Sequence, residues 1–204
     1  MYFSFNTFLY KLLIDPILSG LREGITEFVS PCNKVIDVAC GTGALSVMMA
    51  RKADHVTGID NSAEMINAAR RSAVRKGISN ADFQLVDASA LSQYADRMFD
   101  IAVTSMAIHQ FNTEVALKIL SELKRIAPLI LIADYNHHMP SGWGSRTAWG
   151  IERLAGGDHY RNFRNYMHKG GIHWFVRESG LKIRKEYIRG GGVFIIAVCE
   201  KQGF

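Results

Sequence analysis

The feature that most constrains this chain is a strand, a glycine-rich turn and a helix in direct succession over residues 35–46. Lys34–Ala39 is rich in β-branched residues, apart from Asp37, and predicts a short buried strand. The turn Cys40-Gly41-Thr42-Gly43 follows at once and leads into the helix. Glycines in such a turn let the backbone come close to a ligand, and the start of a helix favours a negative group. We therefore expect a ligand with an anionic group over Gly41–Gly43.

Acidic residues follow the next two expected strands. His55–Ile59 is a second apolar run, and it ends in Asp60, about twenty residues beyond the glycine turn, where a carboxylate can accept both hydroxyls of a ribose. Ala81–Val86 predicts a third strand, followed by Asp87. A carboxylate at Asp87 can accept from an amine, cap a helix over Ala88–Tyr94, or do both. The sequence therefore predicts a nucleoside-containing ligand along one edge of a parallel sheet.

The rest of the chain continues the alternation of strands and helices and ends in a hairpin. Residues 99–111 predict a fourth strand closed by a histidine-containing turn, 112–126 a helix, and 128–133 a fifth strand. Ile172–Ser179 is the last expected helix. Leu181–Ile188 and Val193–Glu200 then predict two strands joined by a glycine turn. We expect five parallel strands followed by an antiparallel hairpin.

The spacing Asp37-x-x-x-Gly41-x-Gly43 at the end of a first strand resembles the first motif of class I S-adenosylmethionine (SAM) dependent methyltransferases. Residues 99–111 resemble the fourth-strand motif of the small-molecule members, those with a type 11/25-like methyltransferase domain. The resemblance implies an α/β fold with a Rossmann-like seven-stranded sheet, in which five parallel strands and a C-terminal antiparallel hairpin carry helices on both faces.

The resemblance also implies SAM as the cofactor and methyl transfer to a small-molecule acceptor as the reaction. Asp37 would hold the methionine end of SAM, or it would only brace the loop as a buried carboxylate. Asp60 would hold the ribose and Asp87 the adenine amine. Tyr10 is a further candidate on physical grounds, because an aromatic face or a phenol oxygen near a sulfonium is favourable. The expected cofactor-binding residues are Tyr10, Asp37, Ala39, Cys40, Gly41, Thr42, Gly43, Asp60, Asn61, Met65, Asp87, Ala88, Ser105 and Met106.

Alignment of acceptor, methyl and sulfur can supply most of the catalysis, so we expect no metal. Where the acceptor must lose a proton, the catalytic candidates are His109 and Tyr135, with the loop histidines His137 and His138 behind them. The insertion 137–171 sets aromatic and basic residues between glycines, as in a lid that closes on substrate. An inert structural insertion is the alternative. The lid candidates that suit an acidic acceptor are His159, Arg161 and Arg164.

Length and charge determine the remaining expectations. The 204 residues, 48% of them hydrophobic, suit one domain over 1–204, with N-terminal helices in 1–30. Three cysteines without metal-ligand spacing, and no long apolar run, predict a cytoplasmic protein that does not span a membrane. The net charge of +5 lies in the last third, where 11 Lys/Arg oppose 5 Asp/Glu from residue 137 onward. This excess suits an acidic acceptor. The oligomeric state is open, with a homodimer as one option.

Two other function classes stay open. An NAD(P)-binding oxidoreductase would share the glycine turn and Asp60, but it leaves Asp37 and the closing hairpin unexplained. A catalytically silent SAM-binding or interaction module would share every cofactor residue. RNA as the acceptor is favoured only by the basic last third, so we do not expect nucleic acid as a partner.

Overall fold

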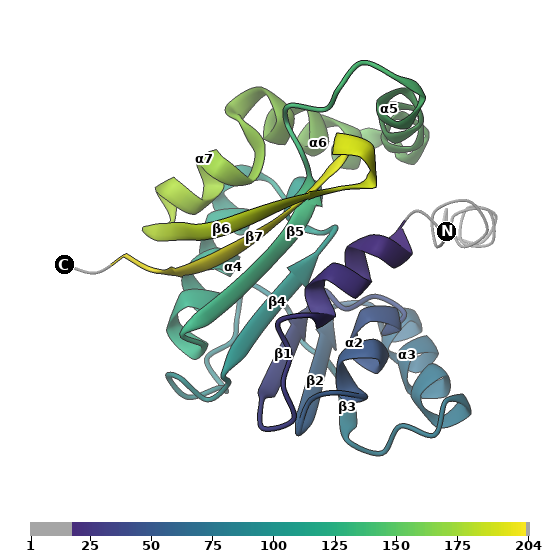
Figure 1. Ribbon diagram of the computed structural model, residues 1–204, viewed down its shortest axis with the longest axis vertical. Coiled ribbons are helices and arrows are strands. Elements are labelled where there is room, and N and C mark those ends of the chain that lie inside the picture. The colour runs from purple at the N-terminus through teal and green to yellow at the C-terminus, as the bar shows by residue number, and fades with distance from the viewer. Residues whose placement is uncertain (1–17, 203–204) are drawn as a thin grey trace.

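The computed structural model describes residues 18–202, and a seven-stranded sheet forms its centre (Figure 1). The strand order is β3-β2-β1-β4-β5-β7-β6. The expected architecture of five parallel strands and a C-terminal antiparallel hairpin is confirmed. The strands are β1 (Lys34–Val38), β2 (His55–Asp60), β3 (Ala81–Leu85), β4 (Ile101–Ser105), β5 (Leu129–Tyr135), β6 (Leu181–Arg189) and β7 (Phe194–Lys201).

The first strand lies at the middle of the sheet and pairs in parallel with both β2 and β4. Its apolar side chains Val35, Ile36 and Val38 are fully buried, as the run of β-branched residues predicts. The chain leaves β1 toward β2 and β3 on one side, and returns to β4 and β5 on the other. The carboxyl ends of β1 and β4 are therefore the place where the strand order reverses, which is where open α/β sheets bind ligands.

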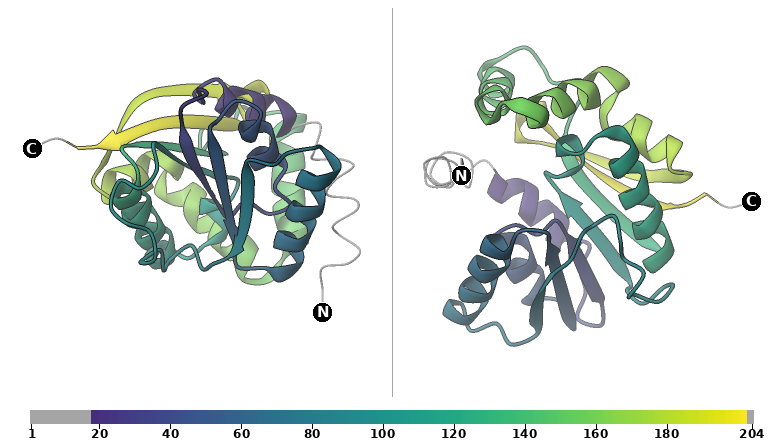
Figure 2. Two further views of the ribbon diagram at one scale, coloured as in Figure 1. Left: turned by 90° about the horizontal axis from the view of Figure 1, so that it is seen from below. Right: turned by 180° about the vertical axis from the view of Figure 1, so that it is seen from behind.

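Helices cover both faces of the sheet (Figure 2). A helix over residues 18–26 precedes β1 and buries Leu21 and Ile25. Helices α2 and α3 pack on the β1–β3 part, whereas α4 and α7 pack on the part that contains β5 and β6. The helices are α2 (Ala44–Ala50), α3 (Ala63–Arg75), α4 (Thr113–Ile126), α5 (Trp143–Ala155), α6 (Gly157–Lys169) and α7 (Gly171–Glu178), with 3-10 turns η1 (Ile108–Gln110) and η2 (Gly190–Gly192).

The expected helix over Ala88–Tyr94 is replaced by turns. Asp87 accepts hydrogen bonds from the Ser89 amide and the Ser89 hydroxyl, each at 2.8 Å, and so forms a local turn. The guanidinium of Arg125 donates to the carbonyl oxygens of Tyr94 and Leu91, again at 2.8 Å. These contacts satisfy carbonyls that would otherwise bond along a helix, so the alternative that Asp87 caps a helix was wrong.

The insertion 137–171 folds into helices α5 and α6 and leads into α7. The glycines of its two Trp-Gly pairs lie within α5. Phe163 and Tyr166 of α6 are among the largest fully buried side chains. The Tyr166 hydroxyl donates to the carbonyl of Tyr135 at 2.8 Å and accepts from the amide of Ile172 at 3.1 Å. The insertion therefore shares its core with the sheet, and its function as a lid stays a prediction.

Within residues 18–202, no helix combines the length and the apolar character needed to cross a membrane. Residues 1–17 of the expected N-terminal helical region, including the expected cofactor residue Tyr10, lie outside the described residues.

Candidate functional site

The glycine turn after β1 uses its two glycines for different purposes. Both have a left-handed backbone, with φ of 54° at Gly41 and 71° at Gly43. A Cβ added to Gly41 would meet nothing within 4 Å, so this backbone faces open space. A Cβ added to Gly43 would lie 2.7 Å from the Cβ of Ala69 and 2.9 Å from the Phe83 ring. Gly41 therefore allows a ligand to approach, whereas Gly43 allows α3 and β3 to pack against the turn.

Two residues at the reversal point of the sheet have strained backbones. Ala39 follows β1 with φ of 61°, and Met106 follows β4 with φ of 55°. Such a conformation costs about 1–3 kcal/mol for a residue with a side chain, and it is typical of ligand sites. Because β1 and β4 are neighbours, both residues lie at the same edge of the sheet. Both were expected to bind cofactor, and that role stays a prediction.

Asp60 ties the glycine turn to the end of β2. Its Oδ2 accepts from the Gly41 amide and its Oδ1 from the Ser62 amide, both at 2.9 Å. These bonds fix the orientation of a half-buried carboxylate, whose remaining lone pairs can accept from ligand hydroxyls. The Gly43 amide donates to the Cys40 carbonyl at 3.0 Å. The amides of both glycines thus donate hydrogen bonds within the protein. Fewer amides of this turn are therefore available to a ligand than the sequence predicts.

Asp37 is 1% exposed and accepts a hydrogen bond of 2.5 Å from the Ser46 hydroxyl. Burial raises its pKa to about 7, although the Ser46 bond and the nearby Arg22 act in the opposite direction. This geometry favours the bracing role over direct contact with a ligand. Ser46 occupies the position of the third glycine in a dinucleotide-binding turn. Its hydroxyl supplies the hydrogen bond that the buried carboxyl of Asp37 needs.

The other expected cofactor residues follow the same strand ends. Burial raises the pKa of the Cys40 thiol, which disfavours a nucleophilic role. Asp87 is exposed, and the hydrogen bonds from Ser89 lower the pKa of its carboxyl. The residues that are exposed or half-buried in the structure are Thr42, Asn61, Met65 and Ser105, while Ala88 is buried.

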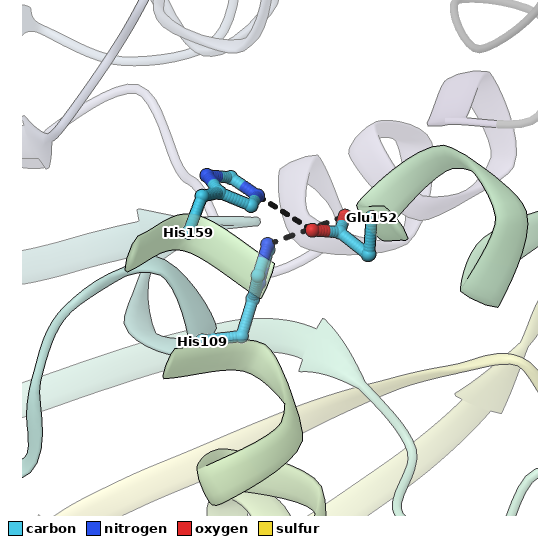
Figure 3. Close-up of side chains that lie close together, drawn as sticks. All are labelled: His109, Glu152 and His159. Atoms are coloured by element: carbon cyan, nitrogen blue, oxygen red, sulfur yellow. Dashed lines mark hydrogen bonds and ion pairs between the residues drawn. The ribbon is translucent and has the colours of Figure 1, made fainter. Parts of the chain in front are cut away.

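A second group of polar side chains is buried beyond the ends of β4 and β5 (Figure 3). We call it the histidine–glutamate cluster, and it contains His109, Asp134, Tyr135, Glu152 and His159. His109 of η1 is 1% exposed, and its Nδ1 lies 2.5 Å from Oδ1 of the fully buried Asp134. The His109 amide also donates to Asp134, at 3.1 Å. The other ring nitrogen, Nε2, faces Glu152 Oε1 at 3.5 Å.

Glu152 joins the cluster from α5 and His159 joins it from α6. The Tyr135 hydroxyl donates to Glu152 Oε1 at 2.9 Å, and His159 Nε2 lies 2.5 Å from Glu152 Oε2. Burial alone would lower the pKa of His109, but Asp134 and Glu152 outweigh it and raise the pKa to about 10. Burial would raise the pKa of Glu152, but the hydrogen bonds from His109 and His159 hold it well below its ordinary value. The cluster is therefore a tightly coupled charge network.

The structure brings both catalytic candidates into this cluster but turns them away from solvent. His109 and Tyr135 are buried, whereas the His159 side chain is 30% exposed. His159 was expected in the insertion, but its partner Glu152 was not expected in the site. Asp134 was not expected there either. Asp134 directly precedes Tyr135 at the end of a strand, a signal that could have marked it. Among the other lid candidates, Arg161 pairs with Asp158 at 2.5 Å and Arg164 lies over the Tyr160 ring.

The loop histidines His137 and His138 form a separate group with His173 of α7. The ring of His137 lies 3.8 Å from that of His138 and 5.1 Å from that of His173, centroid to centroid. His173 Nε2 contacts Glu186 Oε2 at 2.8 Å. Burial and the two neighbouring histidines lower the pKa of His137. One pocket is lined by His137, His138, His173 and Glu186, among others. No residue of the histidine–glutamate cluster lines this pocket.

Comparison with known proteins finds methyltransferases among the similar sequences and structures. Residues 35–127 match a family model described as a methyltransferase domain. A ubiquinone biosynthesis O-methyltransferase of Aeromonas salmonicida is 30% identical over 105 residues, which cover 52% of this chain and 44% of that protein. This chain spans less than half the length of the first curated relatives that it matches.

Solved structures extend the likeness to most of the chain. A SAM-dependent methyltransferase from Aquifex aeolicus superposes with a TM-score of 0.64 at 17% identity, covering 89% of this chain and 90% of that one. The [4+2]-cyclase SpnF superposes with a TM-score of 0.65 at 18% identity, covering 89% and 79%. Because a cyclase shares the fold, the superpositions establish the architecture and not the reaction. Residues 35–127 are thus similar to a methyltransferase domain, and the described chain shares the fold of the SAM-dependent methyltransferase from Aquifex aeolicus.

Proposed function

We propose that this chain transfers a methyl group from SAM to a small-molecule acceptor at the carboxyl ends of β1, β4 and β5. The observation that carries the proposal is the hydrogen bond from the Gly41 amide to the Asp60 carboxylate. It holds an acidic side chain and an open backbone position together where the strand order reverses. The family match over residues 35–127 supports the same conclusion.

The residues present fit SAM. The open space at Gly41 admits a ligand against the backbone, and Asp60 has lone pairs for ribose hydroxyls. Asp87 is exposed and its lowered pKa keeps the carboxylate ready to accept from an amine. When bound, SAM supplies an electrophilic methyl group on a sulfonium that is already a good leaving group. The chain then has to align the acceptor with that methyl group.

The acceptor side is formed by the insertion and the histidine–glutamate cluster. The name of the Aeromonas relative, an O-methyltransferase, supports a hydroxyl as the acceptor group. We assign His109 and Tyr135 as positioning residues, because both contact Glu152 inside the protein. His159 is the cluster member that reaches solvent. An acidic acceptor remains a weaker proposal, since Arg161 is already paired with Asp158.

Calorimetric titration of the purified chain with SAM, S-adenosylhomocysteine, NAD and NADP tests the cofactor. We expect binding of the two adenosyl ligands and its loss in Asp60→Ala. The matched control is Asp54→Ala, which removes an exposed carboxylate at the opposite end of β2 and should bind like the wild type. Binding of NAD without a response to S-adenosylhomocysteine would refute the proposal in favour of an oxidoreductase.

Transfer itself is tested with methyl-labelled SAM and a panel of small hydroxylated aromatic acceptors, with total RNA as a separate arm. Label in a small molecule supports the proposal, and label in RNA would replace the acceptor class. Cofactor binding without transfer to any acceptor would favour the silent SAM-binding module.

A further inference from the structure

Three metal-ligand side chains converge in the histidine–glutamate cluster. The nitrogen atoms of His109 and His159 and a carboxylate oxygen of Glu152 all lie within 4.8 Å of one another. They come from η1, α5 and α6, and Figure 3 shows the two imidazole rings directed at one carboxylate. We propose that His109, Glu152 and His159 bind a divalent transition-metal cation of the Zn²⁺ type, with SAM chemistry taking place beside it.

The distances suit such a cation after a small movement. Zn²⁺ binds imidazole nitrogen and carboxylate oxygen at about 2.0–2.2 Å in tetrahedral geometry, so neighbouring ligand atoms lie roughly 3.3–3.6 Å apart. His109 Nε2 and Glu152 Oε1 are already 3.5 Å apart. His159 Nε2 and Glu152 Oε2 are 2.5 Å apart and must separate by about 1 Å. Gly156, with φ of 67°, is the single residue between α5 and α6. Because glycine is conformationally permissive, the backbone can rotate there and let the two side chains move apart.

Groups behind the ligands orient them as in known metal sites. Asp134 accepts from the His109 ring, from the His109 amide and from the Tyr135 amide, at 2.5, 3.1 and 2.8 Å. A carboxylate on Nδ1 directs Nε2 of the same ring toward a metal. The Tyr135 hydroxyl holds Glu152 on its Oε1. Two of the three ligands therefore have a second partner that fixes their orientation.

The charge of the site also suits a divalent cation. Asp134 and Glu152 are 0% and 4% exposed, and burying two carboxylates is costly without positive charge nearby. In the described part of the chain their ion pairs are with His109 and His159, not with lysine or arginine. A divalent cation would take the place of the proton on Nε2 of His109 and would then balance both carboxylates.

The cation would have a direct use in the proposed reaction. Three protein ligands leave a fourth position open, as in catalytic zinc sites. A hydroxyl bound there would release its proton to solvent more readily, and its oxygen would then form a bond to the methyl carbon as the carbon–sulfur bond of SAM breaks and S-adenosylhomocysteine leaves. This use rests on the proposed function, whereas the binding of the metal does not.

The test is a titration of the full, chelator-treated chain with Zn²⁺ and with Co²⁺, whose visible absorption reports nitrogen and oxygen ligands. We expect one equivalent to bind and to raise the melting temperature. Glu152→Gln and His159→Asn should each weaken binding by at least about 100-fold, since changing even an outer partner costs about 10–100-fold. Asp134→Asn should fall within that smaller range.

The matched control is His168→Asn, which makes the same substitution on α6 outside the cluster. A second control, His173→Asn, removes a histidine from the separate group around His137. Both should bind metal like the wild type, and circular dichroism checks that every variant is folded. The inference is overturned if the wild type takes up neither ion, if folded Glu152→Gln binds as tightly as the wild type, or if His173→Asn is the variant that loses the metal. Loss of SAM binding with metal binding intact would count against the proposed function alone.

Discussion

Gly41 and Gly43 lie two positions apart in the sequence, but alanine should have different effects at the two. At Gly41 it should mainly weaken ligand binding, and at Gly43 it should mainly lower stability. A left-handed backbone costs an alanine about 1–2 kcal/mol, and both positions would incur this cost. Alanine at 43 would also force its Cβ to 2.7 Å from Ala69 and 2.9 Å from Phe83. Overpacking of this kind adds about 1–3 kcal/mol. We therefore expect unfolding free energy to fall by about 1–2 kcal/mol in Gly41→Ala and by about 2–5 kcal/mol in Gly43→Ala.

Thermal unfolding followed by circular dichroism measures the difference. One kcal/mol shifts the melting temperature of a domain of this size by about 2–4 °C, so Gly43→Ala should melt about 2–12 °C below Gly41→Ala. Titration with S-adenosylhomocysteine should give the reverse order. Gly41→Ala should lose at least about tenfold in affinity, because its methyl group enters the ligand space. Equal melting temperatures, or weaker binding by folded Gly43→Ala than by Gly41→Ala, would refute this division of roles.

Two further predictions concern Asp37 and Arg125. The raised pKa of Asp37, about 7 against 3.8, means that its stabilising contribution is complete below about pH 4 and is lost as the pH rises through 7, by up to about 4 kcal/mol. Asp37→Asn should therefore lose less unfolding free energy between pH 5 and pH 8 than the wild type in urea titrations, and equal losses would contradict the assignment. Arg125→Ala should lower stability by about 2–4 kcal/mol and expose residues 88–94 to proteolysis, since the carbonyls of Leu91 and Tyr94 lose their charged donor. The control Arg71→Ala removes an exposed arginine of α3, and similar proteolysis of both variants would speak against this explanation.

The sheet could be predicted from sequence because its signals are local. The parallel strands β1, β4 and β5 are short, largely apolar runs, and Asp60 stands at the end of β2 in the sequence itself. The helix α4 begins after Asn112, whose side chain accepts from the amide of Val115, and asparagine is a preferred residue at that position. These features depend on neighbours within a few residues, so a local sequence pattern is enough to predict them.

The features that escaped prediction depend on distant contacts. The missing helix at 88–94 depends on Arg125, which lies more than thirty residues along the chain. Glu152 has no local pattern that distinguishes it from a solvated acid on α5, and only the fold brings it to His109. The paired use of Asp60 and Gly41 could be anticipated in position, but not in the hydrogen bond that links them.

The Tyr166 hydroxyl, bonded to the carbonyl at the end of β5 and to the first turn of α7, couples the insertion to the unfolding of the whole domain. Swinging α6 outward would break both bonds and uncover Phe163, so that motion would amount to partial unfolding and would be rare. Substrate exchange would then involve movement of α5 about Gly156, while α6 stays in place. Selection for a new acceptor would accordingly act first on the exposed positions of α5, where a side chain can change without disturbing the buried Ala148 and Glu152.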